Sequence, residues 1–403
     1  MADIDVLIVG AGAAGSACAE ALSEAGYGGS VVVAGRDVDP PYERPYCSKD
    51  YLRAKLTREE TYLELPDGLD LRIRTSVTKL DPEAKTAKLS SGDEVSFGTA
   101  VLGTGANVRR VRVDGCDLDG IHYLRTLGNS DSIREGTADA EHVVLIGGSY
   151  IACEVAASLT AEGRRCTLVM QESQPLSLGF GPTASDFLSG VLRDHGIDWV
   201  GNDELAHFEG DTRTTSSSGT GGGHVRKVVT AGGRELAADA VVLGIGVTPD
   251  VMLGKAAGLA IADSGGIACA QTLETSAPGV YAAGDNCDYD SVVHGRRLRV
   301  EHWEHARAQG AHVGRVIAGA AEPFTEIPYF WSDLADWATF EYVGPASHWD
   351  DEVIRGSIDD GEFTIFYLAR GTVMGALTVG RSDDLDRARE LMTRDEPVAA
   401  DEI

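Results

Sequence analysis

Two short glycine-rich segments constrain the fold of this chain more than any other feature. The first, Gly10-Ala-Gly-Ala-Ala-Gly15, follows the apolar run Asp5–Val9, and the second, Gly147-Gly-Ser-Tyr-Ile-Ala152, follows His142–Ile146. An apolar run that ends in a glycine turn and leads into small residues is typical of a buried strand followed by a closely packed helix. A further apolar run follows each expected helix, at residues 30–34 and 166–170, and so completes two β-α-β units.

The first turn carries the complete pattern G-x-G-x-x-G. Its first glycine permits a tight turn, its second lets a pyrophosphate approach the backbone, and its third lets the helix pack on the strand. The amino end of that helix then stabilises the phosphates. The pattern predicts a Rossmann-type nucleotide site, without saying which nucleotide, formed by Gly10, Gly12, Ala13, Ala14 and Gly15.

One expected feature of this unit is missing. An acid after the second strand normally accepts hydrogen bonds from the adenosine ribose. Arg36 stands at that place and Asp37 follows it. Two interpretations remain open: Asp37 replaces the usual acid, or the ribose contact is lost.

The second turn departs from the simple pattern. Ser149 replaces its second glycine and Ala152 its third, although both residues are small enough for a tight turn. Glu172 follows the strand expected at residues 166–170, where a carboxylate accepts ribose hydroxyls and repels a 2′-phosphate. We therefore expect NADH rather than NADPH at this turn, with NADPH as the alternative.

Charged groups follow the first unit. The segment Pro41-Tyr-Glu-Arg-Pro-Tyr-Cys-Ser-Lys49 is a rigid loop that carries Arg44, a candidate partner of pyrophosphate, and Lys49, a candidate partner of a flavin. An ordinary proline-rich loop with solvated charges is the alternative. Asp285, after Ala-Ala-Gly, is a candidate acceptor for ribityl hydroxyls or simply a turn residue.

Length and composition set the remaining limits. A chain of 403 residues is longer than one hydrophobic core usually organises, so two or three domains are expected. No apolar run is long enough for a membrane helix. The net charge of −28 disfavours nucleic acid as a partner, and the seven cysteines lack a Cys-x-x-Cys pair, so no zinc site is expected. With no recognisable leader, we expect a cytoplasmic protein without membrane insertion. The polar stretch Gly210 to Gly223 is expected to form a hairpin tip without chemistry.

Together these motifs resemble FAD-dependent NAD(P)H reductases of the ferredoxin-reductase, monodehydroascorbate-reductase and apoptosis-inducing-factor type. The resemblance also rests on Leu102-Gly-Thr-Gly105, Gly244-Ile-Gly-Val-Thr-Pro249, Arg299-Val-Glu-His-Trp-Glu-His305 and Phe330-Trp-Ser-Asp333. It implies an α/β fold with two Rossmann-like, glutathione-reductase-like domains and a C-terminal α+β interface domain. The expected boundaries are 1–115 and 247–325 for the FAD domain, 116–246 for the NAD(P)H domain and 326–403 for the interface domain.

The resemblance also implies the cofactors and their residues. Lys49, Glu154, His302 and Trp331 are expected to tune the flavin, with no essential acid or base, and Tyr150 to shield it until nicotinamide arrives. The expected FAD residues are Gly10, Gly12, Ala13, Ala14, Gly15, Arg36, Asp37, Arg44, Lys49, Val77, Thr104, Gly105, Asp285, Glu301, His302, Trp303 and Trp331. The expected NAD residues are Gly147, Gly148, Ser149, Tyr150, Ile151, Glu154, Glu172 and Gly246.

The implied activity is hydride transfer from NADH to FAD, followed by electron transfer to a ferredoxin-type or other redox protein or to a small molecule. Two alternatives stay open. One is a slow, redox-sensing interaction flavoprotein like apoptosis-inducing factor, and the other is disulfide or peroxide reduction through the single thiol of Cys47. The sequence leaves the acceptor open, and also whether the protein is a monomer or a homodimer.

Overall fold

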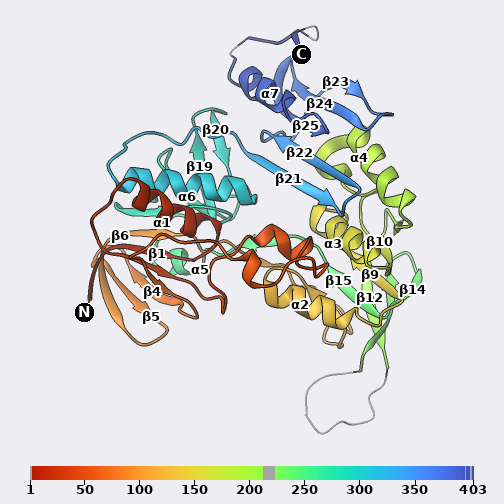
Figure 1. The fold of residues 1–403 in the computed structure, drawn as a ribbon, viewed down its shortest axis with the longest axis horizontal. Coiled ribbons are helices and arrows are strands. Elements are labelled where there is room, and N and C mark those ends of the chain that lie inside the picture. Colours follow the sequence, from red (N-terminus) through yellow and green to blue (C-terminus); the bar gives the residue numbers. More distant parts are fainter. Residues whose placement is uncertain (1, 212–222, 395, 400–401) are drawn as a thin grey trace.

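The computed structural model describes residues 2–211, 223–394, 396–399 and 402–403. Figure 1 shows two sheet-and-helix bodies side by side, one in red, orange and teal and the other in yellow and green, with a blue C-terminal sheet above them. Most of the expected hairpin tip, residues 212–222, lies outside the described residues. No helix among the described residues is both long and apolar enough to cross a membrane.

The first sheet contains the first glycine turn. Its strands are β1 (Ala2–Val9), β2 (Val31–Ala34), β3 (Asp70–Arg72), β4 (Val77–Asp81), β5 (Thr86–Leu89) and β6 (Glu94–Leu102). Their order is β3-β2-β1-β6-β5-β4, and β18 (Val280–Ala282) also pairs with β6, so a segment distant in sequence returns to this sheet.

Two helices cover one side of this sheet, α1 (Ala13–Glu24) and α6 (Trp303–Ile317), and they lie next to each other in Figure 1. They approach very closely, because a Cβ added at Gly310 would lie 2.0 Å from the carbonyl oxygen of Ala14. Glycine is therefore required there. The close packing brings the beginnings of both helices to the same end of the sheet.

The second sheet contains the second glycine turn. It is parallel, in the order β11-β10-β9-β15-β8. Its strands are β8 (Ile121–Tyr123), β9 (His142–Ile146), β10 (Arg165–Val169), β11 (Asp198–Val200) and β15 (Ala240–Leu243). Its helices are α2 (Leu127–Gly136), α3 (Tyr150–Ala161) and α4 (Ser177–Asp194). A small antiparallel sheet follows, of β12 (Leu205–Gly210), β13 (Val225–Thr230) and β14 (Glu235–Ala237).

Short elements join these bodies. The two crossing segments, β7 (Ala106–Val108) and β16 (Val247–Pro249), pair antiparallel. The remaining elements are the 3-10 turns η1 (Arg44–Ser48) and η2 (Glu59–Thr61), helix α5 (Met252–Ala256), and a sheet of β17 (Ile267–Cys269), β19 (Cys287–Ser291) and β20 (Arg296–Leu298).

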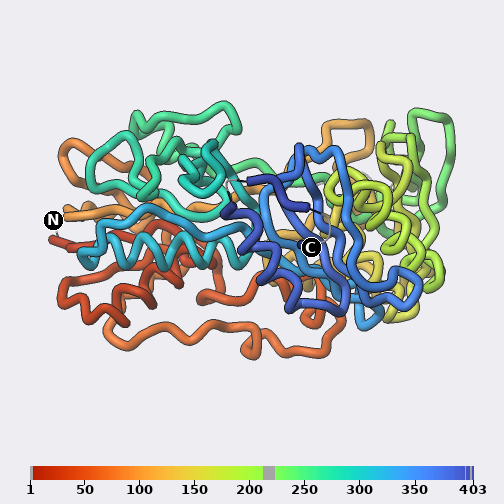
Figure 2. The backbone as a smooth tube through the Cα atoms, turned by 90° about the horizontal axis from the view of Figure 1, so that it is seen from above, coloured from red at the N-terminus to blue at the C-terminus, as the bar shows by residue number. Residues whose placement is uncertain are grey.

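The C-terminal body is an antiparallel sheet in the order β21-β22-β25-β24-β23. Its elements are β21 (Tyr329–Leu334), β22 (Ala338–Val343), β23 (Asp351–Ser357), β24 (Glu362–Ala369), β25 (Thr372–Val379) and α7 (Asp384–Met392). Its buried side chains share one core with those of the second sheet, and Figure 2 shows the blue segment lying over the middle of the molecule. The expected α/β fold with an α+β C-terminal part is confirmed.

Both helices begin inside their glycine-rich segments: α1 begins at Ala13 and α3 at Tyr150. Each helix starts directly after its turn, with Gly12 or Ser149 in extended conformation as the N-cap residue. The free backbone N–H groups of the first turn of each helix therefore lie at the glycine segment itself.

Candidate functional site

A cavity of about 570 Å3 lies between the first sheet, the second sheet and the C-terminal sheet. Its wall includes both glycine turns, the segment after β6, the end of β15, the beginning of α6 and two aromatic residues of β21. Cavities of several hundred cubic ångströms are typical of cofactor and substrate sites. One cavity thus joins the two units that the sequence predicted separately.

The three motif glycines of the first turn differ in what surrounds them. Gly10 has a φ of 108°, and a Cβ there would lie 2.1 Å from the carbonyl oxygen of Gly103. A Cβ at Gly15 would lie 1.9 Å from the carbonyl oxygen of Gly10, so this glycine serves helix packing behind the wall. Gly12, in contrast, faces the cavity, and the atom nearest to an added Cβ is Nη2 of Arg44 at 4.0 Å.

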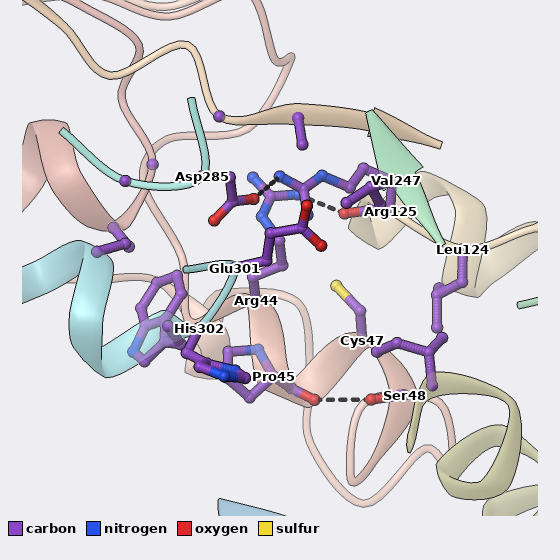
Figure 3. A pocket seen from close by; sticks show the side chains of 18 of the residues that line it. Arg44, Pro45, Cys47, Ser48, Leu124, Arg125, Val247, Asp285, Glu301 and His302 are labelled. Carbon is purple, nitrogen blue, oxygen red and sulfur yellow. Dashed lines mark hydrogen bonds and ion pairs between the residues drawn. The ribbon is translucent and has the colours of Figure 1, made fainter. Parts of the chain in front are cut away.

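The guanidinium groups of Arg44 and Arg125 meet the carboxylate of Asp285 beside this turn (Figure 3), and the carboxylate of Asp37 lies near Arg44. Arg44 donates to the carbonyl oxygen of Arg125 and to the hydroxyl of Tyr42, and its Nη2 lies 3.5 Å from Asp37. Arg125 pairs with Asp285 at 2.9 Å. This arrangement supplies positive charge for a phosphate and a carboxylate for hydroxyl groups.

Arg36 also borders the cavity, but its guanidinium already has partners. Nη1 lies 2.7 Å from Asp250, and Nη2 donates to the side-chain oxygen of Asn107 at 2.8 Å. Asp250 follows β16 and Asn107 lies in β7, so Arg36 connects the end of β2 to the two crossing segments.

A buried ion pair forms another part of the wall. The ammonium of Lys49 pairs with Glu154, and both residues are more than nine-tenths buried. Lys49 follows η1, whereas Glu154 lies one turn into α3. The two members of the pair are 105 residues apart in the sequence, so only the fold brings them together.

The second glycine turn lies on the opposite side. Gly147 has a φ of 122°, and a Cβ there would lie 2.3 Å from the carbonyl oxygen of Gly244, so it stands behind the wall like Gly15. The Ser149 hydroxyl donates to the carbonyl oxygen of Gly244 at 3.3 Å. Glu172 borders the cavity next to Gly148. A Cβ added at Gly148 would lie 3.4 Å from the carboxylate of Glu172.

Aromatic rings close the cavity between the two turns. The rings of His302 and Phe330 stack with centroids 4.2 Å apart, and Tyr150 lies 5.3 Å from Phe330 and 6.4 Å from Phe180. Burial lowers the pKa of His302 to about 4, so this side chain is neutral at pH 7. Burial, with a smaller effect of Glu301 and Glu154, raises the pKa of Tyr150 to about 12.

Most expected residues line this cavity. From the FAD group these are Gly10, Gly12, Ala13, Ala14, Arg36, Asp37, Arg44, Lys49, Thr104, Gly105, Asp285, Glu301, His302, Trp303 and Trp331. From the NAD group they are Gly148, Ser149, Tyr150, Ile151, Glu154, Glu172 and Gly246.

Val77, like Gly15 and Gly147, is an expected cofactor residue that does not border the cavity. Val77 lies in β4 with its side chain buried in the core of the first sheet. Several lining residues were not identified from the sequence: Arg125, Leu178, Phe180 and Phe330. Phe330 stood in a quoted motif, and Arg125 precedes the capping-box residue Thr126. No local pattern connects Leu178 or Phe180 to a nucleotide site.

Cys47 borders the cavity, and in Figure 3 its sulfur points into it. The residue is 3% exposed, and burial raises the pKa of its thiol to about 12 even though Arg44 and Arg125 act in the opposite direction. A thiol with this pKa is protonated at neutral pH and is a poor nucleophile. Burial of the thiol and its raised pKa therefore argue against the alternative of disulfide or peroxide reduction.

Comparisons with known proteins agree with this site. Residues 4–310 match the model of the family "Pyridine nucleotide-disulphide oxidoreductase", and residues 329–403 match the model "Reductase C-terminal". Putidaredoxin reductase CamA of Pseudomonas putida is 30% identical over 98% of this chain and 93% of its own length. Rhodocoxin reductase of Rhodococcus erythropolis is 28% identical over 99% and 92% of the two chains.

A solved structure has the same fold over almost the whole chain. The ferredoxin reductase of Rhodopseudomonas palustris is 31% identical, with a TM-score of 0.90 over 98% of this chain and 96% of that one. The two family models together span nearly all of the sequence, and the relatives align from end to end. This chain belongs to the pyridine nucleotide-disulphide oxidoreductase family and, within it, groups with the ferredoxin reductases.

Proposed function

We propose that this protein binds FAD, takes hydride from NADH and passes the electrons to a small redox protein of the ferredoxin type. One observation carries the proposal: both glycine turns and the buried Lys49–Glu154 pair border the same cavity. A cavity shared by two dinucleotide units can bring the reactive ends of two dinucleotides together.

The residues around the first turn fit FAD. Gly12 leaves room for a pyrophosphate, while Arg44 and Arg125 provide the cations to bind it and Asp285 the carboxylate for the ribityl hydroxyls. When bound, the flavin supplies hydride acceptance and release of electrons one at a time. The protein's own contribution is to position the reactants and to exclude water.

The second turn fits NADH better than NADPH. Glu172 borders the cavity beside Gly148, at the end of the strand where an adenosine ribose is normally recognised. Its negative charge would repel a 2′-phosphate. We propose that Ser149 and Tyr150 complete this side, with Tyr150 covering the flavin until the nicotinamide replaces it.

The residues at the other end of the cavity are proposed to tune the flavin. His302 is the N-cap residue of α6, so the positive end of the helix dipole faces the cavity. Such a helix end stabilises negative charge on a reduced flavin. Trp331, on β21, borders both this cavity and a second one of about 500 Å3, and so stands between the proposed flavin site and the surface.

The proposed partner follows from the relatives, two of which are named as reductases of putidaredoxin and of rhodocoxin. This chain carries a net charge of −28, so an acidic partner must dock on a local basic area or through uncharged contacts. A small-molecule acceptor and slow, sensor-like turnover are the competing proposals. Measured rates with several acceptors distinguish all three.

We also propose the domain division 1–115 with 247–325, 116–246 and 326–403. It is supported by the pairing of β18 with β6 and by the antiparallel pair of β7 and β16 at the crossings. The cytoplasm is the proposed compartment, because all seven cysteines are free, as expected under reducing conditions.

Anaerobic mixing of the purified holoprotein with NADH tests the proposal. We expect the absorbance of oxidised flavin to disappear, and NADPH to act more slowly at the same concentration. A protein that contains FAD but stays yellow with both nucleotides would show that the assignment of the second turn is wrong. If NADH bleaches the flavin rapidly but ferredoxin, quinone and ferricyanide all reoxidise it slowly, the alternative of a redox-sensing flavoprotein with slow turnover would be favoured.

A further inference from the structure

A buried carboxylate joins three parts of the chain at the wall of the cavity. Oε2 of Glu154 accepts a hydrogen bond from the hydroxyl of Ser48 at 2.5 Å. Oε1 accepts one from the hydroxyl of Ser332 at 2.6 Å and another from the ammonium of Lys49. All four residues are more than nine-tenths buried. The donors come from η1, from the residue after it and from β21, whereas the carboxylate belongs to α3.

Such a carboxylate needs its partners. Burying a charge is costly unless it is paired and hydrogen-bonded, and donors on both oxygens also fix the plane of the group. Lysine, in contrast, has a flexible stem and a rotating ammonium, so its position is set by the anions around it. The orientation of Glu154 therefore decides where the ammonium of Lys49 rests.

Lys49 has a second anion within reach. Its ammonium lies 3.7 Å from the carboxylate of Asp333, the residue after Ser332. Asp333 borders the second cavity, on the outer side of the wall, and Lys49 and Trp331 border both cavities. A shift of the ammonium toward Asp333 would withdraw positive charge from the inner cavity.

We propose that Ser48 and Ser332 are positioning residues for the redox reaction. From opposite sides they hold the Glu154 carboxylate in the orientation that keeps the Lys49 ammonium at the inner cavity. The inference rests on the proposed function, since the group that Lys49 faces there is FAD. It gives the C-terminal sheet a direct part in the site, because Ser332 reaches Glu154 from β21, next to Trp331.

The expected effect has a definite sign. In Ser332→Ala, Glu154 loses one donor, and the Lys49 ammonium gains freedom to move toward Asp333. Less positive charge at the cavity disfavours the anionic reduced flavin, so the midpoint potential of the bound FAD should fall. The limiting rate of flavin reduction by NADH should fall about tenfold, as expected for losing one hydrogen bond to a charged group, with little change in the NADH concentration for half-saturation.

The experiment compares four holoprotein variants with the wild type: Ser332→Ala, Ser48→Ala, Ser332→Thr and Thr378→Val. Thr378 is the matched control, a buried hydroxyl of the same sheet whose bonds stay within that sheet. The potential is measured by reduction with dithionite and the limiting rate by rapid mixing with NADH. Both alanine variants should have a lower midpoint potential than the wild type. Ser332→Thr, which keeps the hydroxyl, and the control Thr378→Val should both have the wild-type potential.

Unchanged potential and limiting rate in an FAD-containing Ser332→Ala protein would overturn the proposal, as would an equal shift in Thr378→Val. If Ser332→Ala does not fold, Ser48→Ala removes the other donor and decides the same question. The dithionite measurement needs no NADH. A wild-type flavin that NADH does not reduce would therefore refute the proposed function, while the comparison of potentials would still test the role of the two serines.

Discussion

Arg36 and Asp250 form an ion pair of 2.7 Å that connects the end of β2 to the segment after β16. The Arg36 side chain is half exposed, and its second nitrogen is taken by Asn107. Exposed pairs of this kind contribute about 1 kcal/mol or less. We therefore expect Arg36→Ala to lower the free energy of unfolding by about that amount in urea titrations. FAD affinity should stay close to the wild-type value, and a large loss would show that Arg36 holds the cofactor directly.

Arg125→Ala should weaken FAD binding much more. This guanidinium borders the cavity and pairs with Asp285 at 2.9 Å, and it is proposed to bind the pyrophosphate. Loss of a hydrogen bond to a charged group costs about 1.5–3 kcal/mol, so the dissociation constant should rise at least about tenfold. Titration of the apoprotein with FAD, followed by flavin fluorescence, measures it. Arg110→Ala, at an exposed site after β7, is the control, and an equal loss in both variants would refute the assignment.

Glu172→Gln should relax the preference for NADH. The substitution removes the charge that would repel a 2′-phosphate and keeps the size of the side chain. We expect the ratio of kcat/KM for NADPH to that for NADH to rise about tenfold, a change of about 1.4 kcal/mol. Glu204→Gln, at an exposed glutamate after β11, controls for the change in total charge. An unchanged ratio in Glu172→Gln would place the adenosine ribose elsewhere.

The Cys47 thiol should be inert in the folded protein. Its pKa of about 12 leaves almost no thiolate at pH 8, so alkylation by iodoacetamide should be slow until the chain is unfolded. Cys47→Ala should still be reduced by NADH at nearly the wild-type rate. Rapid labelling of Cys47 in the native protein, together with loss of activity in Cys47→Ala, would restore thiol chemistry as the function.

Four histidines, of which His305 and His312 are buried and His294 and His302 partly buried, should make the protein sensitive to mild acid. Burial lowers the pKa to about 4 in His294, His302 and His312 and to about 3 in His305. In the unfolded chain these side chains have a pKa of about 6.5. Between about pH 4 and pH 6.5 the unfolded state therefore binds more protons than the folded state. Stability should therefore fall as the pH drops from 6.5 toward 4.

Melting temperatures measured across that pH range test this expectation. His312→Gln should show a shallower decline than the wild type, because one titrating group is removed. The variant His348→Gln, at an exposed histidine, should follow the wild-type curve. A melting temperature that does not change between pH 6.5 and 5 would contradict the low pKa values of these four histidines.

Local patterns predicted the parts of the site that are local in the chain. The turns at Gly10 and Gly147 could be identified because a strand, a turn and a helix follow within a few residues. The place of Phe180 at the cavity could not be predicted. It depends on a break in helix α4 at Gly181, whose φ is 74°, and on packing of the Phe180 ring against Phe330 of the C-terminal sheet. Arg125 likewise meets Asp285 only after the chain has folded, at a separation of 160 residues.

The roles of Arg36 and Val77 also depended on tertiary contacts. Arg36 was notable in the sequence as the wrong residue for a ribose contact. Its partners are Asn107, in β7, and Asp250, directly after β16, and these two strands pair only in the folded protein. Val77 was expected at FAD, yet its place in β4 turns its side chain into the core. Spacing along the chain does not contain this information.

The most direct test of the account is the transfer of electrons from NADH to a [2Fe–2S] ferredoxin under anaerobic conditions. With catalytic amounts of this protein, each NADH consumed should reduce about two ferredoxin molecules, because hydride carries two electrons and the cluster accepts one. Ferredoxin should stay oxidised when the protein is omitted. Rapid flavin bleaching by NADH without any change in the absorbance of the iron–sulfur cluster, while ferricyanide is readily reduced, would contradict the proposed role as a ferredoxin-type reductase.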